Sequence, residues 1–85
     1  MNFTVFWLEE AVDHLTEIWI EAHNRNAVTA AQAEIDRRLS VNPHHYAVHV
    51  AEGLYRIQVS PLQVLFEISE QPHEIKVVSV RQDTV

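Results

Sequence analysis

The chain has 85 residues, of which 47% are hydrophobic and one is glycine, so we expect a single domain over residues 1–85 with one modest core. Twelve Asp and Glu against six Lys and Arg give a formal charge of −6, which argues against a broadly basic nucleic-acid-binding surface but allows a local basic patch. The absence of cysteine excludes disulfides and thiolate chemistry. With no membrane-length apolar run and no secretory signal pattern, the sequence favours a cytoplasmic protein without membrane contact.

The first predicted elements are a strand followed directly by a helix. Residues 2–8 are β-branched and aromatic, which suits a strand buried on both faces, or on one face beside an edge. Glu9 and Glu10 place negative charge where the dipole at a helix N-terminus favours it. Apolar residues at helical spacing then predict one buried stripe: Ala11, Val12, Leu15, Ile18, Trp19 and Ala22. Acidic residues four apart should form the solvated opposite face: Asp13, Glu17 and Glu21.

A second helix is predicted over residues 27–39, with Asn26 as its N-cap. Its expected buried stripe consists of four apolar residues: Val28, Ala31, Ile35 and Leu39. Pro43 ends this helix, because proline disfavours helical geometry in the residue before it. The short connection between the helices predicts an antiparallel helical hairpin. Residues 44–52 are expected to form a loop or irregular segment.

Three consecutive strands are predicted over residues 54–59, 62–68 and 74–80, which are rich in β-branched, aromatic and leucine side chains. The two-residue connection between the first two makes them antiparallel. Alternation assigns six residues to the core face: Tyr55, Ile57, Val59, Val64, Phe66 and Ile68. The outer face would carry apolar residues beside Arg56 and Lys76, which indicates that a partner covers it: Leu54, Leu65 and Val78.

The element order β-α-α-β-β-β predicts an α+β fold. In it, a two-helix antiparallel hairpin packs on a small, mainly antiparallel four-stranded sheet. The direction of the first strand in that sheet stays open.

This order and several local patterns resemble the RelE/ParE superfamily of bacterial toxins, also known as plasmid stabilisation proteins. The resemblance covers nearly the whole chain and rests on FTVFW (3–7), LTEIW (15–19), RNAVTAA (25–31), IDRRL (35–39), NP (42–43), GLYR (53–56), PLQVLFEI (61–68) and VVSV (77–80). It implies the toxin of a type II toxin–antitoxin module, neutralised by a small antitoxin. The implied targets are mRNA, cleaved on the ribosome, or DNA gyrase.

The resemblance also implies the site residues. Arg56 matches the basic residue that members often carry on the first of the three strands, whereas Gln63 stands where nuclease members often have an arginine. Arg81 lies where active members place a histidine or tyrosine, and an arginine there stabilises charge but is a poor acid or base at neutral pH. Arg56 and Arg81 are therefore the candidate catalytic residues of a weak or inactive endoribonuclease. No cofactor and no metal are expected.

Other interpretations stay open. The acidic balance and Gln63 favour a non-enzymatic interaction domain derived from such a toxin, and gyrase inhibition would need no nuclease site. Arg56 and Arg81 could also be ordinary exposed residues that keep the sheet soluble. Three neighbouring histidines raise a zinc hypothesis, but without cysteine or an H-E-x-x-H pattern we expect surface histidines: His44, His45 and His49. The sequence leaves homodimerisation open.

Overall fold

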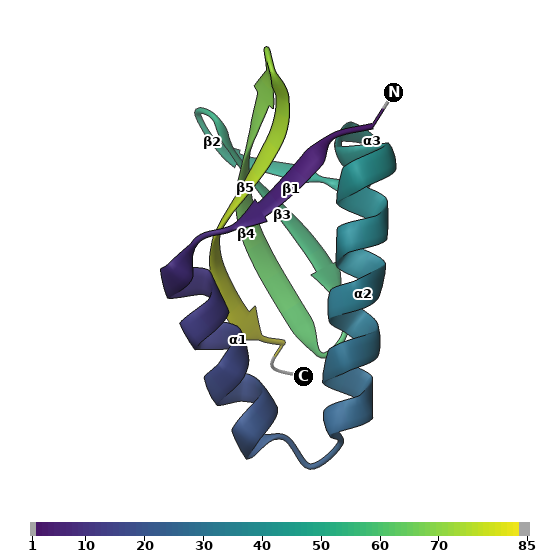
Figure 1. Cartoon of the computed structure of the whole chain (residues 1–85), viewed down its shortest axis with the longest axis vertical. Helices are drawn as coiled ribbons and strands as arrows, with labels where there is room; N and C mark the ends of the chain where they lie inside the picture. Colours follow the sequence, from purple (N-terminus) through teal and green to yellow (C-terminus); the bar gives the residue numbers. More distant parts are fainter. Residues whose placement is uncertain (1, 84–85) are drawn as a thin grey trace.

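The computed structural model describes residues 2–83. Its elements, in chain order, are β1 (Thr4–Trp7), α1 (Glu9–Glu21), α2 (Arg25–Val41), α3 (Pro43–Tyr46), β2 (Val48–Ala51), β3 (Leu54–Val59), β4 (Leu62–Glu70) and β5 (His73–Gln82). Helices α1 and α2 run in opposite directions and meet at one end of the molecule, as the predicted hairpin requires (Figure 1). No helix within residues 2–83 is long and apolar enough to cross a membrane.

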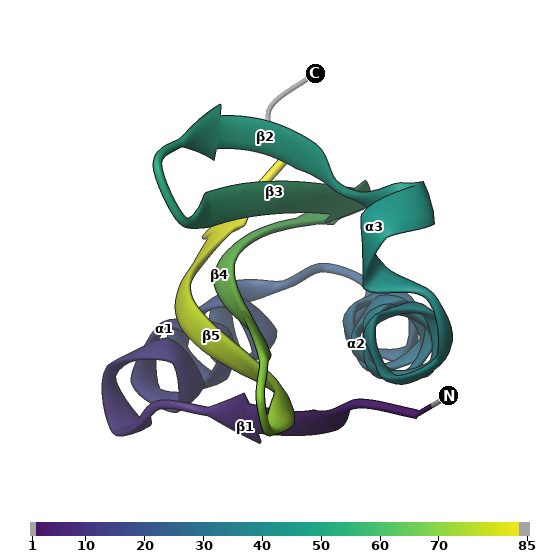
Figure 2. The ribbon, with the colours of Figure 1, turned by 90° about the horizontal axis from the view of Figure 1, so that it is seen from above.

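The strands form one five-stranded mixed sheet in the order β1-β5-β4-β3-β2. Strands β2 to β5 pair antiparallel, and β1 runs parallel to β5 at one edge. The sheet is strongly twisted, with β1 and β2 at its two ends (Figure 2). The predicted α+β class and the antiparallel meander are therefore confirmed, and the direction that the sequence left open for the first strand is parallel.

The prediction of four strands was wrong, because β2 lies in the segment expected to be a loop. All four side chains of β2 are exposed, so no buried face marked it as a strand in the sequence. The same segment also contains the short helix α3, which begins at Pro43. Proline is favoured in the first turn of a helix, where its missing N–H costs no hydrogen bond.

Helix α2 begins two residues earlier than predicted. Its N-cap is Asn24 rather than Asn26, and the Ala27 backbone N–H donates to the Asn24 side chain over 3.1 Å. Both asparagines suit an N-cap, so composition alone did not separate them. The predicted buried stripe is confirmed and is almost fully enclosed: Val28, Ala31, Ile35 and Leu39. The helix ends before Pro43, as expected.

Four of the six residues in the predicted apolar stripe of α1 face the core. Ala11 is fully buried, and Leu15, Ile18 and Ala22 pack against the core. Val12 and Trp19 instead remain 43% and 41% exposed, so the prediction of one buried stripe was wrong for these two residues. The predicted solvated face is exposed: Asp13, Glu17 and Glu21.

The core lies between the two helices and one face of the sheet. The strands contribute seven buried residues to it: Ile57, Leu62, Val64, Phe66, Ile75, Val77 and Val80. The six residues assigned to the core face from alternation are all buried in this core or packed against it, so that register is confirmed. The Trp7 indole N–H donates to Asp36 over 2.7 Å and ties β1 to α2.

Candidate functional site on the outer sheet face

Arg56 and Arg81 lie on the outer face of the sheet, opposite the core. Arg56 on β3 pairs with Leu65 of β4, and Arg81 on β5 pairs with Gln63 of the same strand. Strand β4 therefore lies between the two arginines, which are offset by two residues along the strand direction. Ordinary strand spacing then puts their Cα atoms about 12 Å apart. Two long guanidinium side chains at that separation can reach the same extended ligand.

A β-bulge in β5 shapes this face. Leu65 and Phe66 are consecutive on β4, yet their partners on β5 are Ser79 and Val77. Val78 is thus the extra residue, and the side-chain alternation of β5 changes phase there.

The bulge is the reason that Arg81 is outside. Strict alternation from the buried Val77 would direct Arg81 into the core. Because the phase changes, Val80 is 4% exposed and Arg81 is exposed on the face that carries Arg56. Bulges often re-aim a side chain beside a functional site.

The outer face is close to electrically neutral. It carries three basic and two acidic side chains, a net charge of +1, where the whole chain has −6: Arg56, Lys76, Arg81, Glu67 and Glu74. Among residues 2–83, none of its basic side chains has an ion-pair partner within 4.0 Å. These charges are therefore free to meet a ligand.

Apolar side chains share the outer face, as predicted. Leu54 and Leu65 are half-buried there, beside Arg56. Phe6, opposite Lys76 on β1, and Val48, opposite Arg56 on β2, are 45% and 54% exposed at the two edges. Apolar surface between free charges is typical of a face that a partner covers.

Helix α1 brings a histidine beside Arg81 that the sequence did not link to it. His14 and Glu17 line a pocket of about 250 Å³ together with Ser79 and Arg81. The Nδ1 atom of His14 is buried and has no hydrogen-bond partner among the described residues. A neutral imidazole has a nitrogen that can accept a proton, whereas the guanidinium of an arginine has no acceptor. Only the packing of α1 along β5 reveals this neighbour, because 67 positions of sequence separate the two residues.

The three histidines of the zinc hypothesis point to different partners. His44 Nε2 lies 2.6 Å from Glu70 Oε1, whereas His45 packs edge-on against Tyr46 and His49 against Tyr55. Within residues 2–83, no group of three or more His, Cys, Asp or Glu side chains is placed to hold a metal ion.

The basic residues of α2 are already bound. Arg37 and Arg38 both donate to the Glu34 carboxylate, at distances of 2.6 to 2.9 Å. These hydrogen bonds, with Arg37 foremost, lower the pKa of Glu34 to about 2, and the same pairing raises the pKa of Arg37. Arg25 donates to the Trp19 and Ile20 carbonyls at the end of α1.

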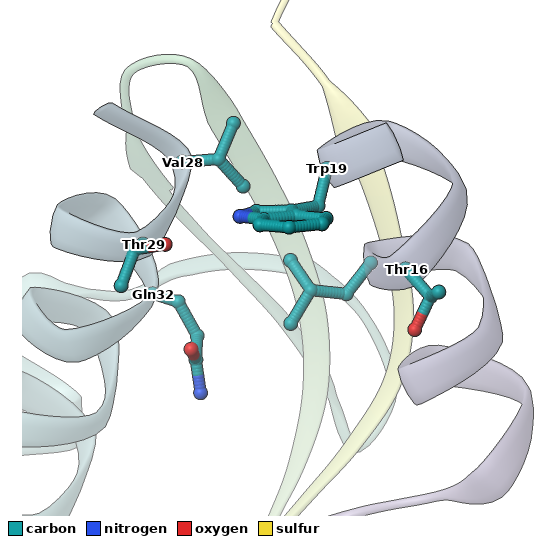
Figure 3. A pocket seen from close by; sticks show the side chains of 6 residues that line it. Thr16, Trp19, Val28, Thr29 and Gln32 are labelled. Atoms are coloured by element: carbon teal, nitrogen blue, oxygen red, sulfur yellow. The ribbon is translucent and has the colours of Figure 1, made fainter. Parts of the chain in front are cut away.

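A second surface feature lies between α1 and α2. A pocket of about 230 Å³ is lined by six residues from the two helices: Leu15, Thr16, Trp19, Val28, Thr29 and Gln32. Figure 3 shows the Trp19 indole reaching from α1 toward Val28 and Thr29 on α2. The Arg25 guanidinium lies 4.7 Å from the centroid of this ring.

The sequence matches no protein-family model and no curated protein. The structure, however, is similar to several solved proteins along its whole length. The toxin–antitoxin complex RelBE2 from Mycobacterium tuberculosis aligns with a TM-score of 0.80 at 15% identity, covering 96% of this chain and 99% of that one.

Two further structures agree to a similar extent. The ParDE toxin–antitoxin system from P. aeruginosa has a TM-score of 0.72 at 13% identity, covering 98% of both chains. The archaeal RelE–RelB complex from Pyrococcus horikoshii has a TM-score of 0.71 at 14% identity, covering 98% of this chain and 97% of that one. The chain therefore has the fold of the RelE/ParE toxins of type II toxin–antitoxin complexes.

Proposed function

We propose that this chain is the toxin of a type II toxin–antitoxin module, acts in the cytoplasm, and is neutralised by a small antitoxin. The observation that carries the proposal is the agreement with the RelBE2 complex over 96% of this chain and 99% of that one. At 15% sequence identity, this structural agreement supports the assignment of the fold. The assignment of activity rests on the residues of the outer sheet face.

We propose weak mRNA endoribonuclease activity for this face. Arg56 and Arg81 would bind the scissile phosphate and stabilise the charge that develops as the adjacent 2′-hydroxyl attacks it. The bond to the 5′-oxygen breaks in this step, and that oxygen takes a proton from water. His14, beside Arg81, would accept the proton of that hydroxyl. Gln63, which pairs with Arg81, adds no positive charge, so transition-state stabilisation should be modest.

A non-enzymatic interaction domain is the second candidate, and the charge of the outer face favours it. A net charge of +1 attracts a polyanion only weakly, while the half-exposed Phe6 and Val48 suit a protein partner. In this alternative the chain keeps the antitoxin-binding surface and has lost the toxic activity.

Induced expression in a bacterial host tests the proposal. Growth, total mRNA and plasmid supercoiling are followed for the wild type, for Arg56→Ala/Arg81→Ala and for Arg37→Ala/Arg38→Ala. The last pair removes the same charge from α2 and is the matched control. We expect growth arrest with mRNA cleavage in the wild type and the control, and loss of both in the outer-face variant.

The other outcomes separate the alternatives. Arrest with intact mRNA and altered supercoiling would replace the nuclease by a gyrase inhibitor. Normal growth with soluble, folded protein would contradict toxicity and favour the interaction domain. Equal loss of toxicity in both double variants would contradict the assignment of activity to the outer face.

A further inference from the structure

Helix α1 presents more apolar surface than the core uses. Leu8, Val12 and Trp19 are 40%, 43% and 41% exposed. They follow one another at spacings of four and seven residues, so they lie on one side of the helix. With the half-buried Leu15 between them, they form a continuous apolar stripe on α1. Its Leu15–Trp19 end lines the pocket between α1 and α2, and the stripe and this pocket together are called the groove.

The shape of this stripe suits a helix. Its 4-3-4 spacing is the pattern by which one helix packs into the grooves of another. From Leu8 to Trp19 it extends about 17 Å at the rise of an α-helix, which is roughly three turns. At the Trp19 end, the pocket of about 230 Å³ offers space for an inserted apolar side chain.

The negative charge around the stripe favours a basic partner. Helix α1 has five carboxylates and no Lys or Arg: Glu9, Glu10, Asp13, Glu17 and Glu21. Glu9 and Asp13 lie within one turn of Val12 and flank the stripe on the side away from the core. On the opposite wall, Asp36 of α2 adds a further carboxylate next to Gln32. Arg25, at the Trp19 end, is held by the carbonyls at the end of α1.

We propose that this groove, the apolar stripe of α1 with the pocket at its Trp19 end, binds a basic amphipathic helix of the antitoxin. Its apolar residues would contact Leu8, Val12 and Trp19, and its Lys and Arg residues would face Glu9 and Asp13. The identity of the partner rests on the proposed function, whereas the charge and shape of its segment follow from the groove. An acidic segment of equal hydrophobicity would meet like charge along α1.

Two synthetic peptides test the proposal on the full chain. Both are helical with leucine at every third or fourth position; one has Lys and Arg flanks and the other has Glu flanks. The chain has two indole N–H groups for NMR, Trp7 bound to Asp36 and Trp19 in the groove. We expect the basic peptide to shift the Trp19 signal and to bind at least about tenfold tighter than the acidic one at low salt. The difference should shrink as salt is added.

A pair of double variants separates local from global charge. Glu9→Lys/Asp13→Lys reverses two charges beside the stripe, and Glu10→Lys/Glu21→Lys reverses two charges elsewhere on α1. We expect the first to weaken binding of the basic peptide about tenfold and the second by less than about twofold. Equal weakening, equal affinity for both peptides, or a Trp19 signal that does not move would each overturn the proposal.

The readout does not depend on toxicity. Binding of the basic peptide by a chain that leaves growth unaffected would support the proposed helix-binding groove and contradict the proposed toxin function. Growth arrest by a chain that does not bind the peptide would overturn the proposed helix-binding groove and would leave the proposed toxin function unaffected.

Discussion

The basic side chains of the helices differ from those of the outer sheet face in what they are bound to. The three helical arginines each donate their Nε–H to a protein acceptor, over 2.6 to 3.1 Å: Arg25, Arg37 and Arg38. Within residues 2–83, the three basic residues of the outer face have no ion-pair partner: Arg56, Lys76 and Arg81. The number of basic residues in the chain, six, is therefore larger than the number of basic side chains that are free to bind a ligand. Half of these side chains are bound within the helices, and the other half gather on one face.

Exchange of the two residues after the bulge, Val80→Arg/Arg81→Val, should lower stability most. The bulge places residue 80 in the core and residue 81 on the outer face, so the exchange moves a guanidinium into the core. An uncompensated buried charge lowers the free energy of unfolding by about 3–5 kcal/mol, which urea unfolding would measure. Arg81→Val alone leaves the core unchanged and should cost less than about 1 kcal/mol. A double exchange no more costly than Arg81→Val would contradict the assignment of residue 80 to the core.

Removal of single basic side chains should lower the stability more in the helices than on the outer face. Arg25→Ala loses two hydrogen bonds to α1 carbonyls and the contact with the Trp19 ring, so we expect it to lower stability by about 1 kcal/mol. Arg81→Ala and Lys76→Ala should stay within about 0.5 kcal/mol of the wild type. Denaturation in urea distinguishes these values, and an equal loss at all three positions would show that the outer-face residues are bound after all.

The smallest expected effect concerns acid pH. The pKa of Glu34 is about 2 in the folded chain against an ordinary value of 4.5, because Arg37 and Arg38 hydrogen-bond to its ionised form. Since the folded-state pKa is depressed, its stabilising contribution is present above about pH 4.5 and is lost as the pH falls through about 2. The stability difference between the wild type and Glu34→Gln should therefore shrink over that range in urea titrations.

A double-variant background is the control for Glu34. When Arg37→Ala/Arg38→Ala removes both partners, Glu34→Gln should have no pH-dependent effect on stability. A pH dependence that survives in this background would show that the two arginines are not its cause.

Regular alternation made most of the fold predictable. The period of two over residues 54–68 placed Ile57, Val64 and Phe66 in the core, and the structure confirms it. Strand β2 escaped prediction because it buries none of its four side chains, so only pairing with β3 defines it. The exposure of Val12 and Trp19 was not predicted, because helical spacing shows only which residues share one side of a helix. It does not show how many of those residues the neighbouring elements cover.

The arrangement of the candidate site was predictable in part. The resemblance singled out Arg56 and Arg81, but their common face depends on the Val78 bulge, and two adjacent valines do not reveal which one is the extra residue. His14 could be found only from tertiary packing, since nothing local relates a residue of α1 to the end of β5. Both omissions are non-local, whereas sequence periodicity is a local property.

The most direct test of the outer face as the functional face follows the five arginine Nε–H signals by NMR during titration with a single-stranded oligoribonucleotide. We predict that the signals of Arg56 and Arg81 shift and sharpen, because these side chains are free to bind phosphate. The signals of Arg25, Arg37 and Arg38 should stay in place, since their Nε–H groups are already bonded. Shifts confined to the helical arginines, or no shift of Arg56 and Arg81, would contradict the account.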